Sequence, residues 1–184
     1  GIGINEEHKL EAKDAYGLSK IEAELLVQKW CNEHNVVCTI LRLPLLVGKN
    51  PPGNLGAMIK GISKGYYFNI GGGIAKKSMV LAEDVAEFIP IVANRGGVYN
   101  LTDGYHPSFF ELSTAIARQI KKSAPMNMPL SIAKAVGFMG DFLGSKAPIN
   151  SQKLKKITAD LTFDDSKAKS VGWKPRKVLD WFSI

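Results

Sequence analysis

Residues 36–54 read VVCTILRLPLLVGKNPPGN, an apolar stretch that runs into a loop rich in proline and glycine. Residues 36–43 are almost continuously apolar and rich in β-branched side chains, which predicts a parallel strand covered on both faces. The following loop leaves the carboxyl end of this strand, and in open α/β sheets that edge is where ligands bind. The stretch therefore predicts an α/β fold with a ligand site close to residues 44–54.

A helix is predicted over residues 14–34, directly before this strand, because apolar residues recur there at helical spacing. These positions are Leu18, Ile21, Leu25 and Trp30. On such a helix Tyr16 and Lys20 share one face, so both can reach one bound ligand. The same spacing also describes two solvated side chains on an ordinary helix, but the strand and loop that follow favour a functional pair.

The chemistry that needs such a pair is proton transfer by a phenol near neutral pH. A free tyrosine titrates near ~10, so a tyrosine base at pH 7 needs a pKa about 3 units lower, worth roughly 4 kcal/mol. Burial alone would raise the pKa, whereas a fixed ammonium beside the phenol lowers it. Lys20 can supply that charge to Tyr16.

Further short motifs follow the tyrosine and lysine in a definite order. They are Tyr16-x-x-x-Lys20, Leu41-Arg42-x-Pro44-x-x-Val47-Gly48, Gly53-Asn54-Leu55, Lys77-Ser78-Met79-Val80 leading to Asp84-Val85-Ala86, Val98-Tyr99-Asn100-Leu101, and Val171-Gly172-Trp173-Lys174-Pro175. In this order the chain resembles the extended short-chain dehydrogenase/reductase family, in particular its NAD-dependent nucleotide-sugar epimerases, dehydratases and reductases. The resemblance implies the C-terminal half of a Rossmann-like parallel sheet plus a small, mostly helical substrate-binding lobe.

The resemblance assigns roles near the cofactor, which would be NAD or NADP. Tyr16 would be the catalytic acid–base, and Lys20 would hydrogen-bond the nicotinamide ribose and lower the tyrosine pKa. The backbone at Pro44, Leu45 and Val47 would lie against the nicotinamide ring. No metal ion is implied.

The resemblance also assigns substrate contacts. Asn54 and Leu55 open a predicted helix whose exposed N–H groups favour the substrate diphosphate. Lys77 stands where many relatives carry an arginine toward the same diphosphate, and a lysine keeps the charge without the bidentate fork. The implied partner is a nucleotide-activated sugar, with a lipid-diphosphate-linked sugar as a variant, and a homodimer is common among relatives.

One expected element is missing from the sequence. Relatives open with a strand and a GxxGxxG turn that holds the cofactor pyrophosphate, and neither Gly1-Ile2-Gly3-Ile4 nor the run Gly71-Gly72-Gly73 fits that pattern. The family's catalytic serine or threonine would also precede residue 1. We therefore expect the C-terminal part of a longer enzyme, in which residues 1–50 and 78–103 belong to the Rossmann domain and residues 51–77 and 104–184 to the substrate lobe.

The amino-acid composition argues against several classes of protein. No apolar run approaches the ~20 residues needed to span a bilayer, and the two cysteines lack metal-ligand spacing, so a cytoplasmic protein with reduced cysteines is expected. The net charge is +7, but no interleaved aromatics or reading helix indicate nucleic-acid binding. An apolar helix predicted over residues 131–143 is either a packing helix of the lobe, the favoured interpretation, or a membrane-surface contact in which Lys134 and Lys146 face anionic headgroups.

The sequence thus favours NAD(P)-dependent epimerisation, dehydration or reduction of an activated sugar. A first alternative is a non-catalytic member of the same fold that binds dinucleotide or a partner. A second is that the 184 residues, as they stand, are an inactive fragment.

Overall fold

The structure, a computed structural model, describes residues 1–12, 14–51, 53–143 and 150–183. Its first strand, β1 (Thr39–Arg42), pairs in parallel with β5 (Gly97–Asn100), with Thr39 opposite Gly97 and Arg42 opposite Asn100. A second parallel pair joins β2 (Leu45–Val47) to β4 (Met79–Leu81). The predicted α/β class and the parallel pairing of the strand in residues 36–43 are confirmed.

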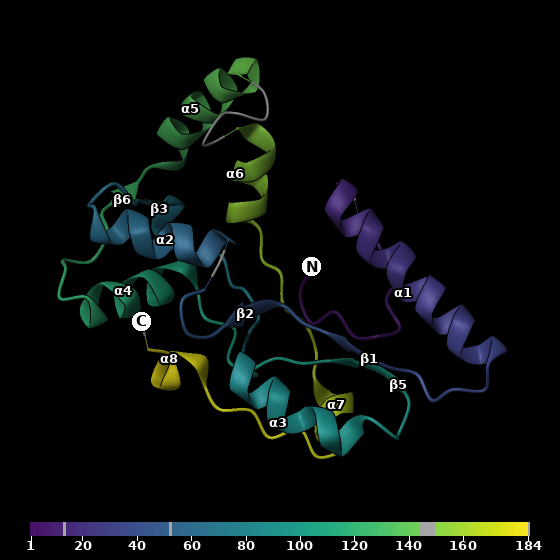
Figure 1. Cartoon of the computed structure of the whole chain (residues 1–184). Coiled ribbons are helices and arrows are strands. Elements are labelled where there is room, and N and C mark those ends of the chain that lie inside the picture. Colours follow the sequence, from purple (N-terminus) through teal and green to yellow (C-terminus); the bar gives the residue numbers. More distant parts are fainter. Residues whose placement is uncertain (13, 52, 144–149, 184) are drawn as a thin grey trace.

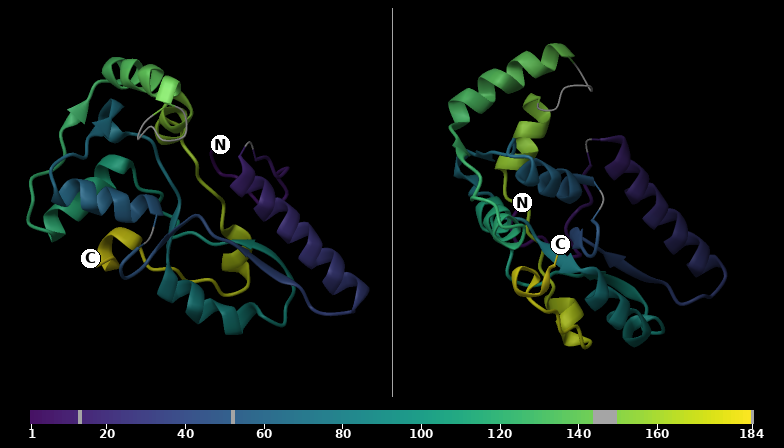
Figure 2. Two further views of the ribbon diagram at one scale, coloured as in Figure 1. Left: turned by 45° about the horizontal axis from the view of Figure 1, so that its top comes forward. Right: turned by 60° about the vertical axis from the view of Figure 1, so that its left-hand side comes forward.

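Helix α1 (Ala15–Glu33) precedes β1 and confirms the helix predicted over residues 14–34. The views of Figures 1 and 2 agree that it stands on the opposite side of the molecule from α4. Glu24 anchors it to β1, because the Arg42 guanidinium donates to that carboxylate at 2.6 and 3.1 Å. Most of its apolar side chains face solvent, including Leu25, Leu26 and Trp30.

The substrate lobe predicted after the strand contains helices and one short parallel pair. Its elements are α2 (Gly53–Ser63), β3 (Asn69–Ile70), the 3-10 turn Gly71–Gly73, α4 (Phe109–Gln119), β6 (Asn127–Met128), α5 (Leu130–Leu143) and α6 (Ser151–Thr158). Between them the chain runs through β4, which pairs with β2, then α3 (Ala82–Val92) and β5, which pairs with β1, and it ends with α7 (Ser166–Ser170) and α8 (Val178–Trp181). The sequence Ser108-Phe109-Phe110-Glu111 predicts a capping box, and the structure confirms it, because Ser108 and Glu111 satisfy each other's backbone N–H groups at the start of α4.

Two hydrophobic cores meet at β4. Met79 and Leu81 lie in a core with β2, α2, α4 and α8, whereas Val80 lies in a core with α3, β5 and Trp173. Alternate residues of a strand point to opposite faces, so this three-residue strand, no residue of which exceeds 4% exposure, contributes to both.

Two local predictions are wrong. The spacing Asp84-x-x-Glu87 predicts that Asp84 caps a helix, but α3 begins at Ala82. The buried Asp84 carboxylate instead accepts from the Arg176 backbone N–H at 2.7 Å and its guanidinium at 2.6 Å. The strand in residues 36–43 is not covered on both faces, since every residue of β1 is only half-buried and Val36, Val37 and Leu43 are exposed.

Candidate functional site

The tyrosine and lysine lie on the first turns of α1. The Lys20 ammonium lies 5.5 Å from the centre of the Tyr16 ring, and the Tyr16 side chain is 73% exposed. Asp14 sets the start of this helix, because its carboxylate accepts from the Gly17 N–H at 2.8 Å. The helix therefore holds a phenol and an ammonium together on an open surface, where a ligand can approach both.

An ion pair connects this end of α1 to the lobe. The Asp14 carboxylate contacts the Lys156 ammonium of α6, and that hydrogen bond, together with the cap to Gly17, holds the pKa of Asp14 below its usual value. Lys156 also lines the larger of the two cavities described below. The ion pair thus links the first turn of α1 to one residue of the cavity wall, while Tyr16 and Lys20 are not among the residues that line the cavity.

That cavity has a volume of about 650 Å³ and lies within the lobe, between α2, α4 and α6. Aromatic and aliphatic side chains form most of its wall, and Asn54, Lys153 and Lys156 add polar groups. Its lining residues are Asn54, Ala57, Met58, Gly61, Tyr66, Tyr67, Phe68, Ile70, Phe109, Met128, Lys153, Lys156 and Ile157. A mostly apolar cleft with a few amide and ammonium groups is suited to an organic ligand that carries negative charge.

The two residues predicted to open a substrate-binding helix, Asn54 and Leu55, lie in different surroundings. Asn54 lines the cavity, whereas Leu55 is 2% exposed and packs in the core with Val47. The Leu55 side chain is therefore part of the core, and only its backbone is left for a ligand contact. The predicted roles of Asn54 and Leu55 stay predictions.

Lys77 has local partners for its ammonium. It donates to the carbonyl oxygens of Lys156 at 3.0 Å and Ala159 at 2.8 Å, at the C-terminal end of α6. Burial lowers the pKa of Lys77, since desolvation disfavours its charged form. Lys77 therefore lies close to α6, which lines the cavity, and its ammonium is hydrogen-bonded to that helix.

The residues predicted to face the nicotinamide are only partly exposed. Val47 is fully buried, Leu45 packs against the same core, and Pro44 lies at the bend between β1 and β2. The burial of these side chains indicates a structural role for them. Only the backbone of this segment is then left to contact a nicotinamide ring, which is the contact that the family resemblance implies. The contact of this segment with a nicotinamide ring stays a prediction.

The glycine run offers no cradle for a phosphate. A side-chain Cβ at Gly73 would lie 2.9 Å from the Phe110 backbone nitrogen and 3.0 Å from the Asn69 Oδ1 atom. These glycines therefore permit close packing of the 3-10 turn against α4. Among the residues that the structure describes, no glycine-rich pyrophosphate turn follows a strand.

Sequence reasoning missed most of the cavity wall. The aromatic run Tyr66-Tyr67-Phe68 predicts a strand, whereas in the structure it lies before β3 and lines the cavity. Lys153 and Lys156 have the spacing of a solvated face, and their spacing does not indicate that they line a cavity together with α2 residues. Burial raises the pKa of the Tyr67 phenol to about 12.

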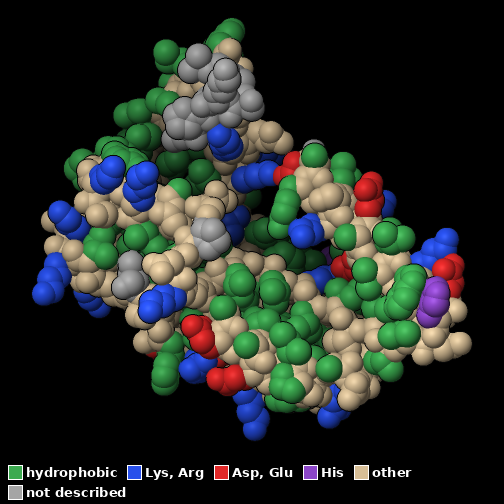
Figure 3. Space-filling view, viewed as in Figure 1, with side chains coloured by type: hydrophobic (Ala, Val, Ile, Leu, Met, Phe, Trp, Pro, Cys, Tyr) green, Lys and Arg blue, Asp and Glu red, His purple; other side chains and the backbone are tan. Residues whose placement is uncertain are grey.

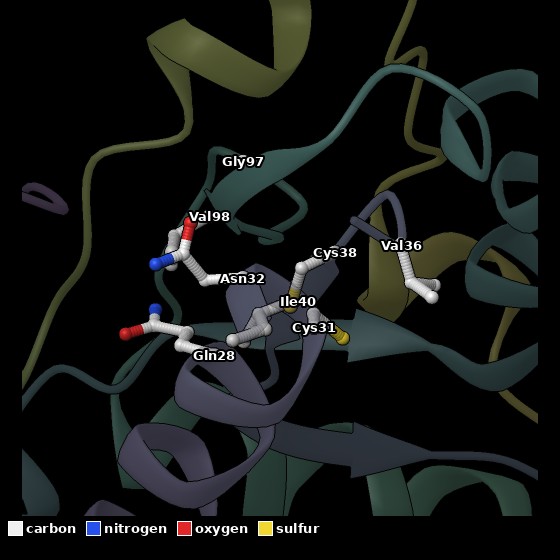
Figure 4. A pocket seen from close by; sticks show the side chains of 8 residues that line it. All are labelled: Gln28, Cys31, Asn32, Val36, Cys38, Ile40, Gly97 and Val98. Atoms are coloured by element: carbon white, nitrogen blue, oxygen red, sulfur yellow. The ribbon is translucent and has the colours of Figure 1, made fainter. Parts of the chain in front are cut away.

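A smaller cavity of about 290 Å³ lies between the end of α1 and strands β1 and β5, with the Cys31 and Cys38 side chains close together in its wall (Figure 4). Burial and a hydrogen bond with Cys31 raise the pKa of the Cys38 thiol, which keeps it protonated and poorly nucleophilic. Within the described ranges no group of three or more His, Cys, Asp or Glu side chains is placed to hold a metal ion. The larger cavity is therefore the candidate site.

Comparison with known proteins identifies the family of the chain. Residues 2–102 match the family model described as the NAD dependent epimerase/dehydratase family. Over 180 residues the chain is 29% identical to the N-acetyl-alpha-D-glucosaminyl-diphospho-ditrans,octacis-undecaprenol 4-epimerase of Escherichia coli O157:H7, covering 92% of this chain and 54% of that protein. It is 26% identical over 188 residues to the UDP-glucose 4-epimerase of Vibrio cholerae, covering 97% and 54%. The chain thus spans about half the length of the curated relatives it matches.

Solved structures share the fold. The UDP-glucose 4-epimerase of Bifidobacterium longum, in complex with NAD+ and UDP, superposes with a TM-score of 0.66 at 20% identity, covering 98% of this chain and 56% of that one. Other structures with this fold hold NAD or NADPH.

Proposed function

The chain belongs to the NAD dependent epimerase/dehydratase family, and on that basis we propose that it carries the acid–base pair and the substrate cavity of an NAD(P)-dependent enzyme acting on a diphosphate-linked sugar. The bound nicotinamide supplies the hydride acceptor and donor. Tyr16 takes the proton of a sugar hydroxyl as the hydride leaves the carbon that bears it, and returns the proton when the hydride comes back. The Lys20 ammonium lies 5.5 Å from the centre of the Tyr16 ring, which supports a role for both side chains at one bound ligand.

The observation that carries the proposal is the junction between α1 and the cavity. The Asp14–Lys156 contact ties the Tyr16 turn to the wall of a cleft of about 650 Å³, a volume in the range of small-molecule sites. The cleft combines an apolar wall with Asn54, Lys153 and Lys156, which supports a diphosphate-linked ligand rather than a neutral one.

The carrier of the sugar is either a nucleotide or a polyprenyl chain. Two curated relatives represent the two cases, one named for a UDP-sugar and one for an undecaprenyl-diphosphate sugar. A panel of UDP-, GDP- and dTDP-sugars, set beside a polyprenyl-diphosphate sugar, distinguishes them by which substrate is converted.

The test of the catalytic assignment is Tyr16→Phe in the protein expressed from its complete coding sequence. Loss of the acid–base group is expected to lower kcat about 100- to 10,000-fold. Affinity for NAD, measured by calorimetry, should stay close to that of the unsubstituted protein, because only the proton-transferring oxygen is removed.

Tyr105→Phe is the matched control, since Tyr105 bonds Glu111 and does not line the cavity. Equal turnover of Tyr16→Phe and the unsubstituted protein would refute the proposal and favour a non-catalytic binding protein with the same fold.

A further inference from the structure

Helix α5 contacts the rest of the lobe through one narrow stripe of small residues. Ala133, Gly137 and Gly140 are buried, and a Cβ at Gly137 would lie 3.5 to 3.6 Å from Asn150, Ser151 and Leu154. The Asp141 carboxylate adds one polar anchor, accepting from the Ser151 N–H at 2.9 Å and its hydroxyl at 2.6 Å. These contacts hold α5 against α6, and most of the other described side chains of α5 are exposed.

The face of α5 opposite this stripe is apolar and exposed. Phe138, Met139 and Phe142 are 63%, 69% and 81% exposed, and Ile132 and Val136 continue the surface. At about 100° per residue these five side chains fall in an arc of roughly 160°, centred away from the buried stripe. The two phenylalanine rings pack edge to face with their centres 5.3 Å apart, and Figure 3 shows hydrophobic side chains over this helix at the top of the molecule. We call these five residues the α5 face.

The net charge of the protein is concentrated in the same part of the chain. Residues 112–159 contain eight lysines and arginines and one aspartate, which is the whole net charge of +7. The basic residues are Arg118, Lys121, Lys122, Lys134, Lys146, Lys153, Lys155 and Lys156. All are exposed except Lys146, which lies outside the described residues. The single acidic residue, Asp141, is bound to Ser151.

From this coincidence we infer that the α5 face docks on an anionic lipid surface, with the helix in the plane of the interface. An exposed apolar helical arc, with Lys134 on the same helix and further lysines on the adjoining α6, has the composition of interfacial helices. Each lysine held near an anionic leaflet strengthens binding about fivefold. The described helices include none that could cross a bilayer, so the contact is with the surface.

Two other occupants fit the observations less well. A second copy would bring another net +7 end against this one, and the like charges oppose a contact between the two faces. Single-stranded nucleic acid binds where aromatic rings line a basic groove, whereas these rings stand on a convex helix among aliphatic side chains.

The inference goes beyond the proposed chemistry and does not depend on it. Because α6 packs on α5 and supplies Lys153 and Lys156 to the cavity, a membrane-bound α5 places the cavity one helix away from the lipid headgroups. Vesicle binding can be measured without substrate or cofactor, so failure of either proposal is seen independently of the other.

The test is co-sedimentation of the protein, expressed from its complete coding sequence, with phosphatidylcholine vesicles with and without phosphatidylglycerol. We expect binding that needs phosphatidylglycerol and falls as salt is raised. Phe138→Ser with Phe142→Ser should reduce the partition coefficient at least tenfold. Lys134→Gln with Lys155→Gln should reduce it about fivefold for each lysine.

Matched controls carry the same changes elsewhere on the surface. Leu26→Ser with Ile89→Ser removes exposed apolar side chains from α1 and α3, and Lys9→Gln with Lys174→Gln removes distant charge. Both should leave vesicle binding unchanged, and thermal melts confirm that each variant is folded. The lysine variants keep the test valid if the phenylalanine variants fail to fold.

Three results would overturn the inference. The first is binding that is equal with and without phosphatidylglycerol or equally reduced by the controls. The second is a change in sedimentation velocity caused by the α5 substitutions without vesicles, which would assign the face to a second copy. The third is tighter binding to a single-stranded RNA oligonucleotide than to the anionic vesicles.

Discussion

At the scale of single residues, Lys77 shows how a side chain acquires a role from segments far away in the sequence. Its ammonium binds the carbonyl oxygens that α6 leaves unpaired at its C-terminal end, where a positive charge is favoured. The family resemblance implied a diphosphate contact for this lysine, and that contact stays a prediction. The carbonyl oxygens of Lys156 and Ala159 could not be foreseen, because only the tertiary fold brings that end of α6 to residue 77.

Tyr67 offers a test of burial in the cavity wall. Its pKa is raised to about 12 because burial disfavours the phenolate. In the unfolded chain the same phenol ionises near ~10, so the unfolded state loses its proton first and stability falls as pH rises from about 10 to 12. Removing the phenol in Tyr67→Phe should abolish this component, worth about 1 kcal/mol at pH 11.

Urea unfolding at pH 8 and pH 11 measures the effect. The exposed Tyr66→Phe serves as the comparison, since Tyr66 is 57% exposed. If both substitutions change the alkaline loss of stability equally, the phenol of Tyr67 is not shielded from water.

At the scale of elements, α1 begins where Asp14 caps it. Asp14→Ala removes the acceptor for the Gly17 N–H and the partner of Lys156, so we expect the melting temperature to fall by a few degrees at pH 7. Asp14→Asn keeps a capping oxygen and should lose less. In the folded protein the pKa of the Asp14 carboxyl is lowered, so the carboxylate contributes its full stabilisation of the fold above the usual pKa of an aspartate. This contribution is lost as the pH falls through the lowered pKa.

Melting curves followed by circular dichroism at pH 7 and pH 3 check this. The difference between Asp14→Ala and the unsubstituted protein should shrink at the lower pH. A difference that is the same at both values would mean that neither the cap nor the ion pair depends on the charge of Asp14.

Elements governed by local sequence were predictable. The capping box at Ser108 depends on residues three apart, and the spacing of apolar residues was sufficient for α1. Asp84 was assigned wrongly because its partner Arg176 lies 92 residues further along the chain. The same limit applies to the site: Tyr16 and Lys20 form a local pair, whereas the cavity is assembled from segments as distant as Asn54 and Lys156.

At the scale of the whole molecule, the C-terminal segment closes the second core. Trp173 is 3% exposed, packs 5.1 Å from Phe88 between ring centres, and donates its indole N–H to the Thr102 carbonyl at 2.9 Å. Trp173→Phe leaves that buried carbonyl without its donor and a small void, so we expect stability to fall by about 2 kcal/mol.

Trp181→Phe is the control, since Trp181 is 62% exposed and should change stability by less than about 0.5 kcal/mol. Urea unfolding followed by circular dichroism measures both. Equal losses in the two variants would show that residues 171–176 do not support the core.

The pattern of apolar residues in the sequence predicted α1 and β1, but it did not predict how much of each element is buried by other parts of the protein. The apolar pattern of residues 36–43 predicted two buried faces, while the structure leaves Val36 and Val37 exposed beside the exposed side chains of α1. Hydrophobicity reports what a residue can bury, and coverage depends on what is packed against it.

The concentration of all net charge within residues 112–159 makes the molecule an electric dipole, with a neutral remainder and a positive end formed by α4, α5 and α6. An electric field exerts a torque on a dipole, so the molecule is oriented before it makes contact with a charged partner. Near any negatively charged partner or surface, the molecule will therefore rotate so that this end arrives first, and the rate of productive encounters will fall steeply as ionic strength rises. The distribution of lysines along the chain thus determines which end of the molecule first approaches a negatively charged partner.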